Sequence, residues 1–94
     1  MTSFTDDQIA HALEALPGWE HDGDAIAKSF EFADFAAAIA FINRAVGPID
    51  EMDHHPEWTN VYNRVDVRLT SHDAGGVTDR DVQLARVLER VAGN

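Results

Sequence analysis

The chain has 94 residues, 7 of them basic and 17 acidic, and its formal net charge of −10 argues against polyanionic partners. Because binding to a phosphate backbone depends on Lys and Arg, we expect no direct contact with nucleic acid and none with an anionic membrane surface. The sequence has no cysteine, which excludes disulfides, thiolate metal ligands and thiol nucleophiles. We find no signal region and no apolar run near the ~20 residues that span a bilayer, and we expect one cytoplasmic domain over residues 1–94.

The first part of the chain predicts a helix and a hairpin. A capping-box pattern over residues 5–8, followed by apolar residues at helical spacing, predicts a helix over residues 6–15. Two strands are predicted over residues 19–21 and 25–32, joined by a short turn of Asp and Gly. Lys28 shares its face of the second strand with apolar residues, so we expect it either at a sheet edge or covering apolar surface with its stem.

An alanine-rich helix follows over residues 34–46, where apolar residues recur at helical spacing. Gly47 and Pro48 interrupt the pattern. Either the helix kinks there and continues to about Met52, or it ends and a second short helix begins with Pro48 in its first turn. We favour the kinked helix.

The last part of the chain predicts a second hairpin and a final helix. Strands are expected over residues 58–62 and 64–71, the second with alternating apolar and polar residues. A linker over residues 72–77 contains two glycines. Thr78 is a plausible N-cap, with carboxylates in the first turn, for a helix that stops at Gly93.

This order predicts an α+β domain with two layers and the succession αββαββα. Its four strands form a mainly antiparallel sheet, and the helices pack on one face of the sheet. The other face and the edge strand are left for another copy of the chain. We therefore expect a homo-oligomer, built by edge pairing or by helix packing.

Three of the five histidines lie in one third of the sequence and are the candidates for chemistry. His54 and His55 follow the second helix, and Pro56 restricts the backbone at this corner. His72 follows the last strand. A free imidazole titrates near ~6.5, so it both gives and takes protons at neutral pH. We expect these corners to meet at one pocket, with carboxylates and the rings of Trp58 and Trp19 nearby.

The same residues resemble the signature of the pterin-4a-carbinolamine dehydratases. The resemblance covers nearly the whole chain. It is carried by Asp53-His54-His55-Pro56-Glu57-Trp58, Asn60-Val61-Tyr62-Asn63, Ser71-His72 and Asp81, and upstream by Gly18-Trp19, Asp24-Ala25-Ile26 and Phe30-Glu31-Phe32-Ala33-Asp34-Phe35.

The resemblance implies a dehydratase that removes water from a 4a-hydroxytetrahydropterin to give quinonoid dihydropterin, in support of tetrahydrobiopterin recycling. It implies no metal and no redox cofactor. The reaction delivers a proton to the departing hydroxyl and removes one from a ring nitrogen, which suits histidines. The resemblance makes His54 and His72 the proton-transfer groups and His55 the group that grips the pterin, with the reverse division left open.

The remaining site residues are also carried over from the resemblance. Those expected to line the substrate site are Pro56 and the segment Ser71-His72-Asp73-Ala74. Asp53 and Asp81 are expected to orient imidazoles or to meet the polar edge of the pterin. Each has a simpler alternative, because Asp53 can be surface charge and Asp81 can serve only the helix N-terminus.

Three departures from the family pattern matter. Asp50 stands where glutamate is common, which puts the reach of that carboxylate in doubt. Gly47-Pro48 breaks a helix that is smoother in familiar members and used for assembly. Ser71 in place of threonine is a mild change.

Two rival interpretations remain. Three histidines with nearby carboxylates can ligate zinc, but adjacent histidines point in different directions and no His-x3-His spacing is present. Alternatively, the chain is a non-catalytic interaction module, since some members of the family also act as dimerisation partners of a transcription regulator. A pure interaction module has no need of a three-histidine pocket.

Overall fold

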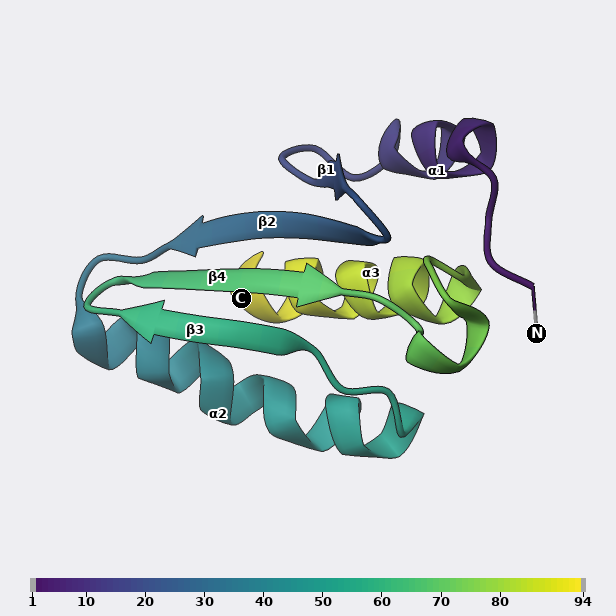
Figure 1. Cartoon of the computed structure of the whole chain (residues 1–94). Coiled ribbons are helices and arrows are strands. Elements are labelled where there is room, and N and C mark those ends of the chain that lie inside the picture. Colours follow the sequence, from purple (N-terminus) through teal and green to yellow (C-terminus); the bar gives the residue numbers. More distant parts are fainter. Residues whose placement is uncertain (1, 94) are drawn as a thin grey trace.

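The computed structural model describes residues 2–93 and has the predicted αββαββα order (Figure 1). One short element is added, a one-turn 3-10 helix in the linker after the last strand. The elements are α1 (Asp6–Leu13), β1 (Glu20–Asp22), β2 (Ala25–Glu31), α2 (Phe35–Met52), β3 (Glu57–Val61), β4 (Arg64–Leu69), η1 (His72–Ala74) and α3 (Asp79–Gly93).

The four strands form one antiparallel sheet in the order β1-β2-β4-β3. Figure 1 shows α2 and α3 side by side behind the sheet, while α1 lies beside β1. The α+β class and the antiparallel sheet are thus confirmed. No helix of the described residues is long and apolar enough to cross a membrane.

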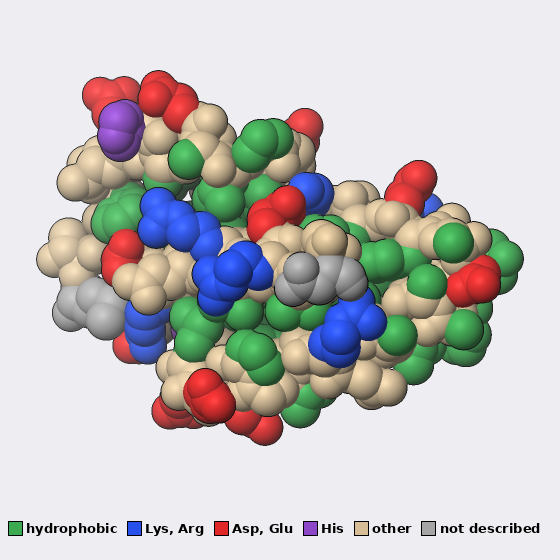
Figure 2. All heavy atoms as spheres, turned by 180° about the vertical axis from the view of Figure 1, so that it is seen from behind, with side chains coloured by type: hydrophobic (Ala, Val, Ile, Leu, Met, Phe, Trp, Pro, Cys, Tyr) green, Lys and Arg blue, Asp and Glu red, His purple; other side chains and the backbone are tan. Residues whose placement is uncertain are grey.

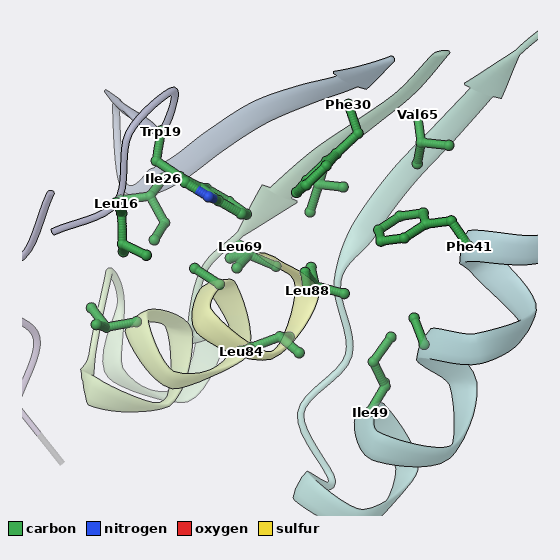
Figure 3. Packing of buried hydrophobic residues seen from close by; sticks show 14 of the residues in the cluster. Leu16, Trp19, Ile26, Phe30, Phe41, Ile49, Val65, Leu69, Leu84 and Leu88 are labelled. Carbon is green, nitrogen blue, oxygen red and sulfur yellow. The ribbon is translucent and has the colours of Figure 1, made fainter. Parts of the chain in front are cut away.

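The core lies between the sheet and the two long helices (Figure 3). Alternate residues of β4 point inward, and Phe41 of α2 is fully buried against them. The Phe41 ring centroid lies 5.1 Å from that of Phe30 and 5.0 Å from that of Phe32. Burying one such side chain stabilises the fold by about 1.5–3 kcal/mol. The sequence therefore predicted correctly that Val65, Val67 and Leu69 face the core from β4.

Lys28 lies on the inner face of β2, where its stem covers apolar surface, one of its two predicted placements. Its Nζ sits 4.7 Å from the centroid of the Phe30 ring and 2.6 Å from Oε2 of Glu89 on α3. The same oxygen accepts a hydrogen bond from Nε1 of Trp19 at 3.0 Å. The charge is thus neutralised within the layer between β2 and α3.

Several predicted ends were wrong by one or two residues. The first helix stops at Leu13, because the next three N–H groups bond to carbonyls three residues back, in a tighter turn. The third strand begins at Glu57 and ends before Tyr62, which has a φ of 50° in the turn to β4. The fourth strand ends at Leu69, two residues early, since Ser71 pairs instead with Gly76 across the following loop.

The second helix is continuous through Pro48 to Met52, so the alternative of a second short helix was wrong. Asp34 caps its start by accepting the N–H of Ala37 at 2.8 Å. Asp53 ends it with left-handed backbone angles, φ 50° and ψ 42°. The chain therefore leaves α2 in a new direction at the residue before His54.

Candidate active site

The three candidate histidines lie at one end of the molecule. The end of α2, the start of β3, the end of β4, η1 and the start of α3 all meet there (Figure 1). The left-handed Asp53 turns the chain, and Pro56 leads it into β3. The predicted corner is therefore present, built by the end of one helix and the start of one strand.

His54 belongs to a buried hydrogen-bond network. Its Nε2 lies 2.6 Å from Oδ1 of Asp81, which has no exposed surface. The other oxygen of Asp81 accepts the hydroxyl of Ser71 and the backbone N–H of Thr78, both at 2.9 Å. The hydroxyls of Ser71 and Thr78 are also 2.9 Å apart. Such a fully bonded network fixes the orientation of the imidazole.

The start of α3 places Asp81 beneath His54. Thr78 accepts the backbone N–H of Arg80 at 3.3 Å, and Asp81 in turn accepts the N–H of Thr78. This reciprocal pattern caps the helix. Asp81 therefore has both of its proposed structural roles, at the helix start and as a partner of an imidazole. Ser71 and Asp81, expected at the substrate surface, lie behind His54 with 1% and 0% of their surface exposed.

The other two imidazoles also face carboxylates through Nε2. His55 Nε2 is 3.1 Å from Oδ1 of Asp50, and His72 Nε2 is 3.5 Å from Oε2 of Glu57. The aspartate at position 50 thus reaches a histidine despite its shorter stem. The side chains differ in exposure, 9% for His54, 58% for His55 and 82% for His72. Each histidine has a carboxylate of its own.

The turn that carries His72 is held to α3. Within η1 the N–H of Gly75 bonds to the carbonyl of His72 at 3.2 Å, and Gly75 takes a φ of 74° that suits glycine. Arg80 Nη2 donates to Oδ1 of Asp73 at 2.7 Å. This hydrogen bond holds the pKa of the Asp73 carboxyl below its usual value. Ala74, the last residue of the turn, is half-buried.

Other predicted neighbours lie elsewhere. Trp19 is buried in the core against Phe30, and the Trp58 ring packs 6.5 Å from Phe41. Asp53 is exposed and serves as the C-cap of α2, with its backbone N–H bonded to the carbonyl of Asp50. Pro56, by contrast, lies at the corner itself and is half-buried.

Two site partners, Glu57 and Arg80, were given no role from the sequence. Glu57 begins β3 opposite Arg68, and Oε2 of Glu57 lies 3.8 Å from Nη1 of Arg68. Arg68 also donates to Asp24 at 2.9 Å, which lowers the pKa of that carboxyl. Strand parity puts Glu57 on the open face, but no local pattern ties it to His72. The role of Arg80 could not be predicted either, because its partner Asp73 belongs to η1 whereas Arg80 belongs to α3.

Beside this end, the open face of the sheet is hollowed. The hollow has a volume of about 630 Å³, and its polar lining includes Glu57, Arg68, Asp22, Ser29 and Thr59. None of the three histidines is among its lining residues. Across residues 2–93, no three His, Asp or Glu side chains converge in a way that could hold a metal ion. The histidines instead form separate imidazole–carboxylate pairs suited to proton transfer.

Comparison of the sequence with known proteins gives one family. The family model described as "Pterin 4 alpha carbinolamine dehydratase" matches residues 2–91. Two relatives carry the name "Putative pterin-4-alpha-carbinolamine dehydratase". The one from Rhizorhabdus wittichii is 53% identical over 91 residues, 95% of this chain and 94% of its own. The one from Thermomicrobium roseum is 46% identical over 92 residues, 98% and 99% of the two chains.

Two solved structures share the fold. A transcriptional coactivator/pterin dehydratase from Brucella melitensis superposes with a TM-score of 0.93 at 45% identity, covering 98% of this chain and 100% of the other. A pterin dehydratase-like protein identified as a RuBisCO assembly factor in the alpha-carboxysome has a TM-score of 0.67 at 18% identity, covering 81% and 88%. The second likeness concerns the fold alone. Sequence and structure together establish that this chain belongs to the pterin 4 alpha carbinolamine dehydratase family.

Proposed function

We propose that this protein catalyses the loss of water from a 4a-hydroxytetrahydropterin to give quinonoid dihydropterin, with histidines as general acid and base. The observation that carries the proposal is the buried His54–Asp81 pair, backed by Ser71 and Thr78, at the corner shared with His55. The family and the names of the relatives support the same reaction.

The reaction needs two proton transfers and no redox change. The bond from the 4a carbon to its hydroxyl oxygen breaks, and a proton joins that oxygen so that water leaves. A ring nitrogen loses a proton, and its electron pair forms the double bond to the 4a carbon. The substrate receives one proton and loses one, so a pair of imidazoles can return to its starting protonation state after each turnover.

His54 is proposed as one of the two proton-transfer groups. The carboxylate of Asp81 only accepts hydrogen bonds, so His54 donates from Nε2. Its Nδ1 is then the basic nitrogen, available to the substrate. Asp81 and Ser71 act through His54 and do not touch the pterin. A charge that forms on the imidazole is stabilised by the carboxylate, as in other His–Asp pairs.

His72 is proposed as the second proton-transfer group and His55 as the group that grips the pterin. The high exposure of His72 suits exchange of protons with solvent. His55, held by Asp50, lies beside His54 in sequence and would bind the polar edge of the ring. The half-buried Pro56 and Ala74 would line the ring. Such a site would need no metal and no redox cofactor.

The test is the decay of enzymatically generated 4a-hydroxytetrahydropterin, followed by ultraviolet absorbance with and without the protein. We expect wild type to accelerate the decay and His54→Ala to lose about 100-fold or more of this acceleration. His21→Ala is the matched control, because His21 is exposed on β1. No acceleration by folded wild-type protein would overturn the proposal and favour a non-catalytic interaction module.

We also propose that the chain forms a homodimer or homotetramer. One stripe of α2 beside its buried side is apolar, and two of its members, Phe35 and Val46, are 51% and 47% exposed. The strand β3 is an unpaired edge of the sheet, and Val61 at its end is also exposed. Apolar surface and an open edge together favour contact between copies.

A further inference from the structure

The structure assigns a positioning role to Arg80, which, through Asp73, fixes the turn that carries His72. The inference rests on the proposed function, since it concerns the placement of one of the proposed proton-transfer groups. It also gives Asp73 a structural role in place of the expected contact with the substrate. Through Asp73, the turn is hydrogen-bonded to Arg80 of α3.

The turn at His72 has few contacts of its own. Its internal hydrogen bonds are from Ala74 N–H to the Ser71 carbonyl at 3.0 Å and from Gly75 N–H to the His72 carbonyl at 3.2 Å. The backbones of Ser71 and Gly76 close its base with two more bonds, at 3.0 and 3.3 Å, and the Ser71 hydroxyl donates to Asp81. Among the residues that the structure describes, the imidazole approaches only Glu57, at 3.5 Å, and it is mostly exposed. A short turn with such contacts is held in place chiefly by what joins it to the rest of the fold.

Arg80 supplies the connection beyond Ser71, at Asp73 in the middle of the turn. Its Nη2 donates to Oδ1 of Asp73 at 2.7 Å, a short charge-assisted hydrogen bond. Its Nε is buried and finds no hydrogen-bond partner among the described residues. Burying a donor without a partner is unfavourable, and the charge-assisted hydrogen bond to Asp73 offsets part of this cost. The lowered pKa of the Asp73 carboxyl agrees with this pairing.

Arg80 and Asp81 are neighbours in the first turn of α3, and each is bonded to a different histidine-bearing segment. Adjacent residues of a helix point about 100° apart, so the two side chains reach different segments. Asp81 reaches His54 after α2, while Arg80 reaches the turn after β4. The capped start of α3 therefore sets how His54 and His72 lie relative to one another.

The experiment compares Arg80→Gln with Arg86→Gln, an arginine further along the same helix. We expect Arg80→Gln to lower kcat about 10-fold with a much smaller change in KM, because a misplaced proton-transfer group slows the chemical step. Asp73→Asn should have the same effect, and Arg80→Lys should recover part of the loss. Arg86→Gln should leave both constants unchanged.

The His72→Ala background separates positioning from general stability. There Arg80→Gln should cause no further fall in kcat, since the group it positions is gone. An equal fall in both backgrounds, or a wild-type kcat for Arg80→Gln, would overturn the inference.

If wild type has no dehydratase activity, the proposed function fails and the positioning role is judged by NMR. Arg80→Gln should then increase the backbone mobility of residues 72–76 and raise the pKa of Asp73 toward its usual value. Unchanged mobility and an unchanged Asp73 titration would overturn the role. Absence of activity thus counts against the dehydratase proposal alone, and the NMR result counts against the positioning role of Arg80 alone.

Discussion

At the scale of single residues, Asp81 is the group on which most contacts of the site depend. All partners of its carboxylate donate to it: the imidazole of His54, the hydroxyl of Ser71 and the N–H of Thr78. The sequence motif indicated both of the structural roles considered for Asp81. It did not indicate that they occur together, because the capping pattern is local whereas His54 lies 27 residues away.

Asp81→Asn tests whether the orientation and tautomer of His54 matter. The amide keeps the size of the side chain but carries one oxygen only. If this oxygen keeps Ser71 and Thr78, the amide NH2 faces Nε2 of His54, which must then accept, and the proton moves to Nδ1. We expect dehydratase activity to fall about 100-fold or more. The free energy of unfolding should fall by about 1–3 kcal/mol.

Activity is measured by the pterin decay assay and stability by urea unfolding. Asp79→Asn is the control, because Asp79 is an exposed carboxylate in the same first turn. An Asp81→Asn variant with wild-type activity would show that the tautomer of His54 is irrelevant to the reaction.

At the scale of elements, the end of α2 determines where His54 and His55 point. Asp53 ends the helix in a left-handed conformation, which costs free energy for any residue with a Cβ. Asp and Asn tolerate it better than most residues. The family resemblance suggested that Asp53 orients an imidazole or meets the polar edge of the pterin, with surface charge as the simpler alternative, and the structure adds a place as a helix cap.

Asp53→Gly separates these two roles. Glycine adopts the left-handed angles without strain, and relief of a strain of about 1–2 kcal/mol exceeds the roughly 0.5–1 kcal/mol that the entropy of glycine costs. A pure cap should therefore keep full activity and gain slightly in free energy of unfolding. Loss of activity with retained stability would instead give the carboxylate a role in the site. Asp53→Asn is the matched control, as it removes the charge and tolerates the same backbone angles. Both variants are measured by urea unfolding and by the decay assay.

The elements themselves could be predicted well because their signals are local. Alternating residues of β4 predicted this strand and its buried side. Helical spacing predicted α2 but only part of its buried side, because Phe35 and Val46 of the expected stripe are exposed while Phe41, outside the stripe, is buried.

The pairs of the site could not be predicted in the same way. The pair of Asp50 and His55 is close in sequence. The other two pairs, Glu57 with His72 and Arg80 with Asp73, each connect separate elements. Only the packed fold brings such partners together.

At the scale of the whole molecule, four large apolar side chains are exposed among residues 2–93: Phe35, Val46, Val61 and Tyr62. Figure 2 shows hydrophobic side chains gathered at the end of the molecule that carries the β3–β4 turn and the start of α2. The large exposed ones at that end include Phe35, Val61 and Tyr62. A monomer of this size gains stability when such surface is covered, since a small core buries a limited share of the chain.

The assembly is tested at two places on this surface. Val46→Glu introduces a charge on the apolar stripe of α2, and Val61→Glu does so at the open edge of β3. We expect light scattering after size exclusion to give wild type a mass of two or four times 10.4 kDa. The variant that disrupts the true interface should have a lower mass, because a buried unpaired charge strongly opposes association. Val46→Ala, which shortens the side chain without adding charge, should keep the wild-type mass.

The two variants also distinguish the modes of assembly. A loss confined to Val46→Glu indicates helix packing, and a loss confined to Val61→Glu indicates pairing of β3 edges. If both variants have a lower mass than wild type and one of them has the mass of a dimer, the wild-type protein is a tetramer that uses both surfaces as interfaces. Neither residue belongs to the hydrogen-bond network of His54, so dehydratase activity should persist in a dissociated variant. A wild-type mass of one chain at high protein concentration would contradict self-assembly and leave this apolar surface for a different protein.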